Sequence, residues 1–216
     1  MGIDVGVEVM QLSDWITPTT PAGTALFLRW NGYHVFSIPK RELARSPHSL
    51  RFFGVGGKRT DPQESFVDCA LRESVEEIGD VVSSINPASQ THLLQADGTI
   101  RAIELVGEAI CPRLILEKRK HTGYGSLAGS DRAYYLVAYN ASLSQQPHPY
   151  NEIAALLYLQ DQHLQAMHKG QSWALADALD QGAIMQLQAG VVLEPTATLV
   201  PHGTAQFLVK AYPDSL

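Results

Sequence analysis

Residues 56–79 read GGKRTDPQESFVDCALRESVEEIG, and this stretch decides the fold class. After the glycine pair, apolar side chains recur at spacings of three and four residues, which is typical of an amphipathic helix. Asp61 suits an N-cap and Pro62 the first helical position, so we expect the helix to begin near these two residues. Gly79 is the expected C-terminal cap. The expected apolar stripe comprises Val67, Ala70, Leu71, Ser74, Val75 and Ile78.

Three carboxylates crowd the second half of this predicted helix. Glu73, Glu76 and Glu77 fall within one turn of each other, and we expect them on the face opposite the apolar stripe. Three glutamates alone are more typical of a solvated helix surface. Their combination with the glycine pair, with Glu64 and with Arg72 favours a cation site instead, because Mg²⁺ prefers oxygen ligands and Arg72 can orient a carboxylate through a bidentate contact.

The rest of the chain alternates strand-like and polar segments. Asn31-Gly32 lies between two apolar runs and predicts a hairpin, as does Asp97-Gly98. Residues 161–168 and 172–186 carry helical signals, and the C-terminal segment is expected to be β-rich, with a third possible hairpin at Pro201-His202-Gly203. The expected strands are 24–30, 33–38, 51–55, 112–116, 133–139 and 153–159.

Composition restricts the possible classes of protein. The chain has 216 residues, 45% of them hydrophobic, which suits one sizeable core, and we expect a single domain over 1–216. No apolar run is long enough for a membrane span, so we expect no membrane association. The net charge of −6 argues against a nucleic-acid partner. The two cysteines do not suggest a disulfide framework, and a cytoplasmic location is expected.

From Glu64 onward, the stretch resembles the signature of the Nudix hydrolase family. Seven residues separate Glu64 from Arg72, and Arg-Glu, Glu-Glu and the terminal Gly79 all follow in the family's order. The box would run from Gly57 to Gly79, with one more residue between Gly57 and Glu64 than the family pattern has. Ser74 and Asp80 stand where the family usually has aliphatic residues, and Val55 stands where many members have proline.

The resemblance implies a fold and a set of roles. It implies an α/β/α sandwich with a mixed β-sheet, with a core over about 20–170 and a β-rich C-terminal extension over about 171–216. Metal ligands for Mg²⁺ or Mn²⁺ would be Glu73, Glu76, Glu77 and Glu64, with Arg72 as the orienting partner. Glu73, or an acid beyond the motif such as Glu152, would activate the attacking water.

The implied reaction is metal-dependent hydrolysis of a diphosphate bond in a nucleoside diphosphate linked to another moiety. Candidate substrate-binding residues are Gly56, Gly57, Lys58, Arg119 and Lys120. Lys118 belongs to the same basic cluster, and Tyr134 is a candidate for stacking on a base. Selectivity is expected from segments 39–50, 117–132 and 170–216, and a homodimer is possible because a β-rich tail can pair between subunits.

Two rival interpretations remain open from the sequence. One is a nucleotide- or nucleotide-sugar-binding module that keeps the fold without turnover. The other is isomerisation of a prenyl diphosphate, which needs an additional acid–base pair such as a cysteine and a glutamate facing the pocket. Cys69 lies within the motif helix and Cys111 has no evident partner, so the second rival ranks low.

Overall fold

The computed structural model describes residues 9–119 and 133–212. The helices are η1 (Leu12–Asp14), α1 (Lys40–Leu43), α2 (Phe66–Ile78), α3 (Asp161–His168), α4 (Leu175–Asp180) and α5 (Thr204–Lys210). The strands are β1 (Val9–Met10), β2 (Ala22–Trp30), β3 (Tyr33–Pro39), β4 (Ser49–Phe52), β5 (Val82–Asn86), β6 (Thr91–Leu94), β7 (Ile100–Leu105), β8 (Leu114–Arg119), β9 (Ala133–Leu143), β10 (Ile153–Leu159), β11 (Ile184–Leu187) and β12 (Thr198–Pro201).

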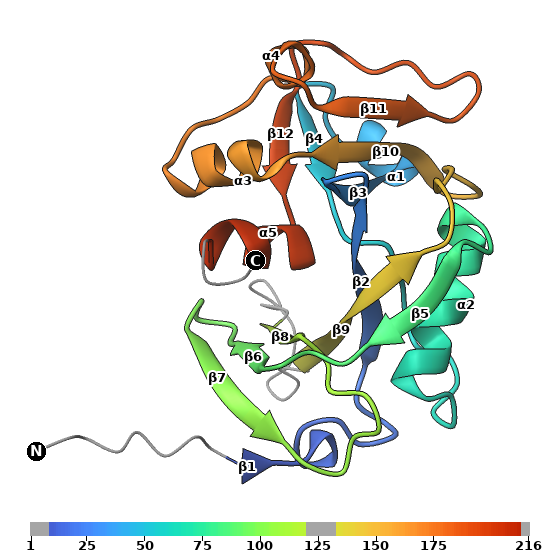
Figure 1. Cartoon of the computed structure of the whole chain (residues 1–216), viewed down its shortest axis with the longest axis vertical. Helices are drawn as coiled ribbons and strands as arrows, with labels where there is room; N and C mark the ends of the chain where they lie inside the picture. The colour runs from blue at the N-terminus through green and yellow to red at the C-terminus, as the bar shows by residue number, and fades with distance from the viewer. Residues whose placement is uncertain (1–8, 120–132, 213–216) are drawn as a thin grey trace, which may run out of the picture.

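A large mixed sheet organises the fold, as predicted. Its strand order is β1-β7-β6-β8-β9-β2-β3-β10-β11, with β5 paired to β9, and β4 forms a separate parallel pair with β12. The pairs β2–β9 and β6–β8 are parallel, whereas β2–β3 and β3–β10 are antiparallel. Figure 1 shows α2 on one side of β2 and β9, and α5 on the other side.

Both faces of the central strands are buried, because helices and loops cover each face. In β2, Ala25 and Phe27 belong to the core under α5, whereas Leu26 and Leu28 belong to the core under α2. This alternation follows from the two-residue period of a strand. It explains why β2, β3 and β10 read as continuous apolar runs.

Both hairpins predicted at Asn-Gly and Asp-Gly pairs are present. Asn31 and Gly32 have φ values of 49° and 86°, the left-handed conformation that a tight two-residue turn between β2 and β3 requires. Gly98, at φ 92°, closes the antiparallel pair β6–β7.

The helix of the motif begins later than predicted. Asp61 does not start it: its carboxylate accepts a hydrogen bond from the Gln63 N–H at 2.8 Å and stabilises a turn. Ser65 is the N-cap instead, and its side chain accepts a hydrogen bond from the Asp68 N–H at 3.0 Å. Gly79 ends α2 at φ 86°, as predicted.

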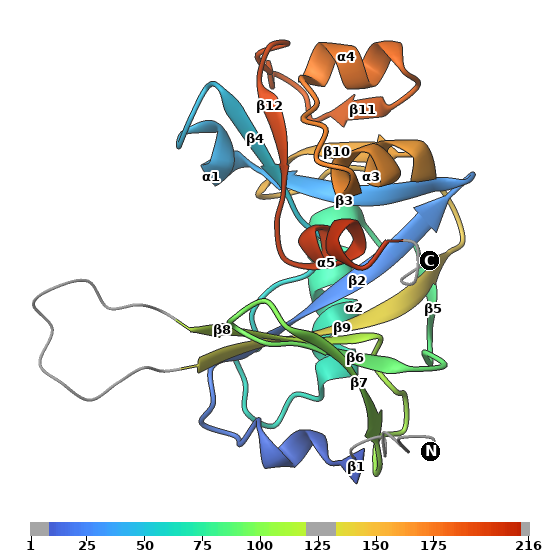
Figure 2. The same ribbon diagram turned by 90° about the vertical axis from the view of Figure 1, so that its left-hand side faces the viewer.

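The C-terminal segment differs most from its prediction. The prediction of a hairpin at Pro201–Gly203 is wrong, because β12 pairs in parallel with β4 and Gly203 is the N-cap of α5. The helical signal over 172–186 corresponds to α4 alone, followed by strand β11. The expected β-rich extension is thus a mixture of two helices and two short strands, and Figure 2 shows how α5 returns over β2.

Among residues 9–119 and 133–212, no helix combines the length and the apolar character that a membrane crossing requires.

Candidate active site

Helix α2 turns two of its glutamates inward. Glu73 and Glu77 are only 8% and 5% exposed, whereas Val75 is 49% exposed. The expectation of an apolar inner face with all three glutamates opposite is therefore wrong. Three of the six buried residues of α2 are small, namely Cys69, Ala70 and Ser74, and they leave room for carboxylates beside the sheet.

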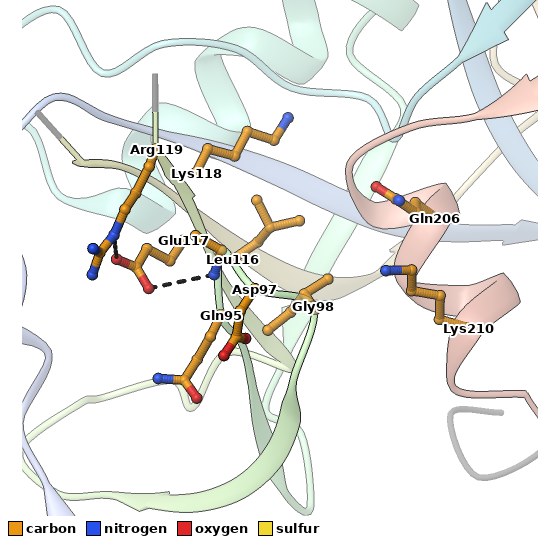
Figure 3. Close-up of a pocket in the computed structure, with 11 residues that line it drawn as sticks. Gln95, Asp97, Gly98, Leu116, Glu117, Lys118, Arg119, Gln206 and Lys210 are labelled. Carbon is orange, nitrogen blue, oxygen red and sulfur yellow. Dashed lines mark hydrogen bonds and ion pairs between the residues drawn. The ribbon is translucent and has the colours of Figure 1, made fainter. Parts of the chain in front are cut away.

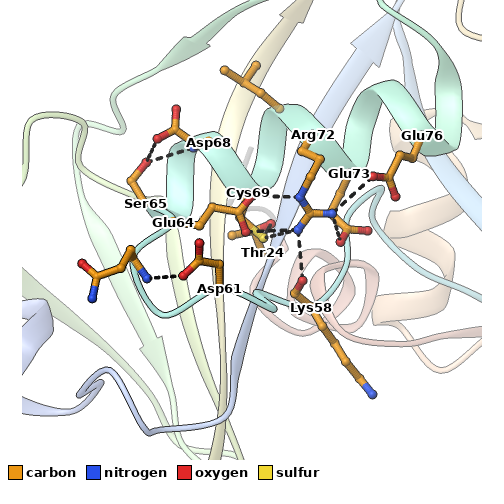
Figure 4. A network of polar contacts seen from close by, with 12 residues as sticks. Thr24, Lys58, Asp61, Glu64, Ser65, Asp68, Cys69, Arg72, Glu73 and Glu76 are labelled. Carbon is orange, nitrogen blue, oxygen red and sulfur yellow. Dashed lines mark hydrogen bonds and ion pairs between the residues drawn. The ribbon is translucent and has the colours of Figure 1, made fainter.

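Arg72 holds several carboxylates together (Figure 4). Its guanidinium donates to both oxygens of Glu64, from Nε at 2.8 Å and from Nη2 at 3.1 Å. Nη1 donates to Glu73 at 2.7 Å and lies 3.4 Å from Glu76. Nη2 also donates to the carbonyl of Lys58 at 3.2 Å, which ties the glycine-rich loop to the helix. A planar fork suits this task because it can donate in several directions at once.

The glycine pair lies directly against the glutamates. The Gly56 N–H donates to Glu77 at 2.8 Å, and the backbone of Gly57 passes so close to Glu73 that a Cβ atom there would collide with its carboxylate. Gly56 has φ 142° and packs against the backbone of Thr24, where a side chain would also collide. The pair is required because the backbone must approach both the sheet and the carboxylates.

These residues surround a cavity of about 500 Å³. The lining carries charges of both signs, with carboxylates from α2 and from the residue before β10, and cations from α1, α2, the glycine loop and β8. Its charged lining residues are Glu73, Glu76, Glu77, Glu152, Arg41, Lys58, Arg72 and Lys118.

Most of the predicted site residues line this cavity, but two of those that the structure describes do not. Glu64, predicted as a supporting metal ligand, is absent from the cavity lining, and both of its oxygens accept hydrogen bonds from Arg72. Arg119 forms an ion pair with Glu117 at 3.0 Å and lines a different cavity. Lys120 lies outside the described residues.

Burial sets the protonation of the inner carboxylates. It raises the pKa of Glu77 to about 8, against the opposing hydrogen bond from Gly56 and with a further contribution from the charge of Glu152. Burial also raises the pKa of Glu73, although its contact with Arg72 opposes the effect. By contrast, the hydrogen bond from Arg72 lowers the pKa of Glu64. Glu77 therefore needs a cation beside it to be fully ionised near neutral pH.

The donor set has the chemistry of a site for a hard divalent cation. Glu73, Glu76, Glu77 and Glu152 offer carboxylate oxygens in one cavity, which is the ligand type that Mg²⁺ and Mn²⁺ prefer. Within the described parts of the chain, no three His, Cys, Asp or Glu side chains are already arranged around a common metal position. Arg72 and the Gly56 N–H instead form hydrogen bonds with Glu73 and Glu77.

Sequence reasoning missed several residues of the cavity wall. Arg41 and Thr204 come from two of the segments in which selectivity was expected, yet no local signal distinguished them there, whereas Lys118 belongs to the basic cluster that the sequence analysis named. Thr204 is 1% exposed, and its hydroxyl has no hydrogen-bond partner among the described residues. Tyr134, a candidate for base stacking, also lines the cavity, and burial raises its pKa to about 12.

The cysteine needed for the isomerase alternative does not face this cavity. Cys69 is fully buried, and its sulfur accepts a hydrogen bond from Thr24 at 3.5 Å. Burial raises its pKa to about 11, which disfavours the thiolate. Cys111 lines a separate cavity, next to β7.

Comparison with known proteins gives a likeness to solved structures only. No family model matches the chain, and no curated protein is significantly similar to it. A MutT Nudix hydrolase from Burkholderia pseudomallei has a TM-score of 0.41 at 14% identity, over 90% of this chain and 98% of that one. A Nudix hydrolase from Nitrosomonas europaea has a TM-score of 0.37 at 11% identity, over 66% of this chain and 58% of that one.

A third similar structure is the E. coli dihydroneopterin triphosphate pyrophosphohydrolase. Its TM-score is 0.37 at 12% identity, over 62% of this chain and 77% of that one. TM-scores and identities this low do not establish a family or an activity for this chain. Its chemistry therefore has to be inferred from the side chains of the cavity.

Proposed function

We propose that the chain is a Nudix-type hydrolase that cleaves a diphosphate bond in a nucleoside diphosphate linked to another moiety, with Mg²⁺ or Mn²⁺ as the cofactor. The proposal rests on the sequence motif of Glu64 to Gly79 together with the position of its glutamates. The observation that carries it is the burial of Glu73 and Glu77 in the wall of a cavity that is also lined by cationic side chains.

A purely structural role does not account for that observation. Burying a carboxylate is costly unless it is paired, and Glu77 has only one backbone N–H as its hydrogen-bond donor among the described residues. The same cavity holds Arg41, Lys58 and Lys118, which suit the oxygens of a phosphate chain. A cavity lined by both carboxylates and cations is therefore expected to bind a metal ion and a polyphosphate together.

The roles follow from the contacts of each residue. Glu73, Glu76 and Glu77 would hold the metal, which when bound neutralises phosphate oxygens and acidifies water. Arg72, fixed by Glu64, positions Glu73. Lys58, whose carbonyl Arg72 holds, places its ammonium beside the substrate phosphates.

Glu152 is the proposed general base. It lies just before β10 on an exposed part of the cavity wall, and Arg72 does not hold it as it holds Glu73. A general base must be free to take a proton from the attacking water, and Glu73 already forms an ion pair with the Arg72 guanidinium. The cytoplasmic location and the homodimer stay predictions.

The test is a product-resolved screen of nucleoside diphosphate derivatives with Mg²⁺ and with Mn²⁺. We expect metal-dependent release of a nucleotide from at least one substrate, and its loss in the double variant Glu76→Gln plus Glu77→Gln. The control is Glu104→Gln plus Glu194→Gln, which changes the net charge equally at two exposed positions outside the cavity. Tight binding of a derivative without any metal-dependent release would favour the binding-module alternative.

A further inference from the structure

A second cavity, of about 610 Å³, lies beside the proposed active site. Figure 3 shows that it is formed by the turn between β6 and β7, by the end of β8 and by α5. Neither the motif nor the proposed reaction assigns a role to it. Its volume is in the range of cavities that hold small ligands, so it can take a substantial part of a substrate.

The two cavities are neighbours along the same structural elements. Lys118 belongs to the wall of both. Helix α5 contributes Thr204 at its beginning to the motif cavity, and Gln206 and Lys210 further along to the second cavity. A ligand with its phosphates near the glycine loop can therefore extend past Lys118 into the second cavity.

The interior of the second cavity presents positive charge. In Figure 3, Lys118, Gln206 and Lys210 project into the space between β8 and α5, whereas Glu117 and Arg119 lie on the other side of β8. This arrangement follows from the alternation of side chains along a strand, which puts Lys118 on one face and its two neighbours on the other.

The two acidic residues of this cavity differ in their partners, because Glu117 pairs with a cation whereas Asp97 has a neutral backbone N–H. Glu117 accepts from Arg119 at 3.0 Å, and Asp97 accepts from the Thr99 N–H at 2.9 Å within the hairpin turn. Lys118 and Lys210 have no ion-pair partner among residues 9–119 and 133–212. Of the five charged lining residues, Lys118, Lys210 and Arg119 are cationic and Glu117 and Asp97 are anionic, so the lining carries a net charge of +1 in a protein whose net charge is −6.

We propose that this second cavity binds a further phosphate of the substrate, remote from the diphosphate that is cleaved. The inference rests on the proposed function and narrows its substrate class to nucleoside diphosphate derivatives that carry an additional phosphate at one end. Lys118 and Lys210 bind that phosphate, and the Gln206 amide donates a further hydrogen bond to it. Both lysines are exposed, so their contribution is modest and falls with ionic strength.

Binding of matched ligand pairs tests this inference. The pairs are NADPH against NADH and coenzyme A against dephospho-coenzyme A, each differing by one phosphate outside the diphosphate. Calorimetric titrations use the Glu76→Gln plus Glu77→Gln background without metal, where turnover is blocked and repulsion is reduced. We expect the phosphorylated member of at least one pair to bind about fivefold more tightly. The preference should vanish in Lys210→Ala and persist in the matched control Lys169→Ala.

Each outcome bears on the inference separately from the proposed function. A phosphate preference that depends on Lys210 supports the inference even when no substrate is hydrolysed, in which case the proposed reaction fails alone. Equal affinity within both pairs overturns the inference, whether or not the wild-type protein hydrolyses a diphosphate. A preference that survives in both Lys210→Ala and Lys118→Ala overturns it as well.

Discussion

Replacing Glu77 with glutamine should stabilise the metal-free protein at alkaline pH. Glu77 is 5% exposed, and burial raises its pKa to about 8. Its ionised form therefore has an unfavourable environment in the folded chain when no cation is present. Glutamine keeps an oxygen that can accept the 2.8 Å hydrogen bond from Gly56, and it removes the charge.

The sign and the magnitude of this change in the free energy of unfolding follow from proton linkage. Between the ordinary pKa of 4.5 and about 8, the unfolded chain is ionised at this position while the folded chain keeps its proton. The folded state thus binds more protons, so the free energy of unfolding falls as pH rises through this window. At 1.36 kcal/mol per pH unit, the full penalty is about 5 kcal/mol above pH 8. We expect about 2 kcal/mol after local relaxation and water access.

Urea unfolding at about pH 5 and at about pH 8 measures this effect. With a chelator present, the free energy of unfolding of Glu77→Gln should exceed that of the wild type by about 2 kcal/mol at the higher pH. At the lower pH the two free energies should differ little. With millimolar Mg²⁺ the wild type should become the more stable of the two proteins, because cation binding stabilises its folded state more. The exposed Glu194→Gln is the matched control. An unchanged pH dependence in Glu77→Gln would refute the reasoning that burial of this carboxylate limits stability.

Two further changes test the geometry of the cavity. In Gly57→Ala, the added Cβ collides with the Glu73 carboxylate, so we expect at least a tenfold loss of kcat. The far-UV circular dichroism spectrum should stay nearly native. An unchanged kcat would contradict the close approach of Gly57 to Glu73. Glu152→Gln should lower kcat about a hundredfold while the affinity for Mn²⁺, measured by electron paramagnetic resonance, stays within about twofold. A large loss of Mn²⁺ affinity would instead make Glu152 a metal ligand, and Glu194→Gln is again the control.

Local signals in the sequence were sufficient for many elements of the fold. Asn31-Gly32 predicted a hairpin because only a few residue types adopt φ > 0 without strain, and this restriction does not depend on tertiary contacts. The run 153–159 predicted β10 because a strand buried on both faces needs continuous apolar character. The start of α2 was misjudged because Asp61 and Ser65 are both good caps.

The C-terminal segment shows where local signals fail. Residues 198–210 are apolar and partly β-branched, which suits either a hairpin or a strand followed by a helix. The parallel pairing of β12 with β4 and the packing of α5 over β2 select the second arrangement. Such pairings join residues far apart in the chain, so propensity alone cannot reveal them.

The sequence by itself determined the order and spacing of the motif's charged residues, with Arg72, Glu73, Glu76 and Glu77 on one helix and Glu64 just before it. Tertiary structure alone decided which of them face the cavity, because the packing of α2 on the sheet turns Glu73 and Glu77 inward and leaves Val75 exposed. Tertiary structure also decided that Lys118, and not Arg119, lines the cavity with these carboxylates. The physical reason is that burial and the direction of a side chain depend on which surfaces pack together, and those surfaces come from distant parts of the chain.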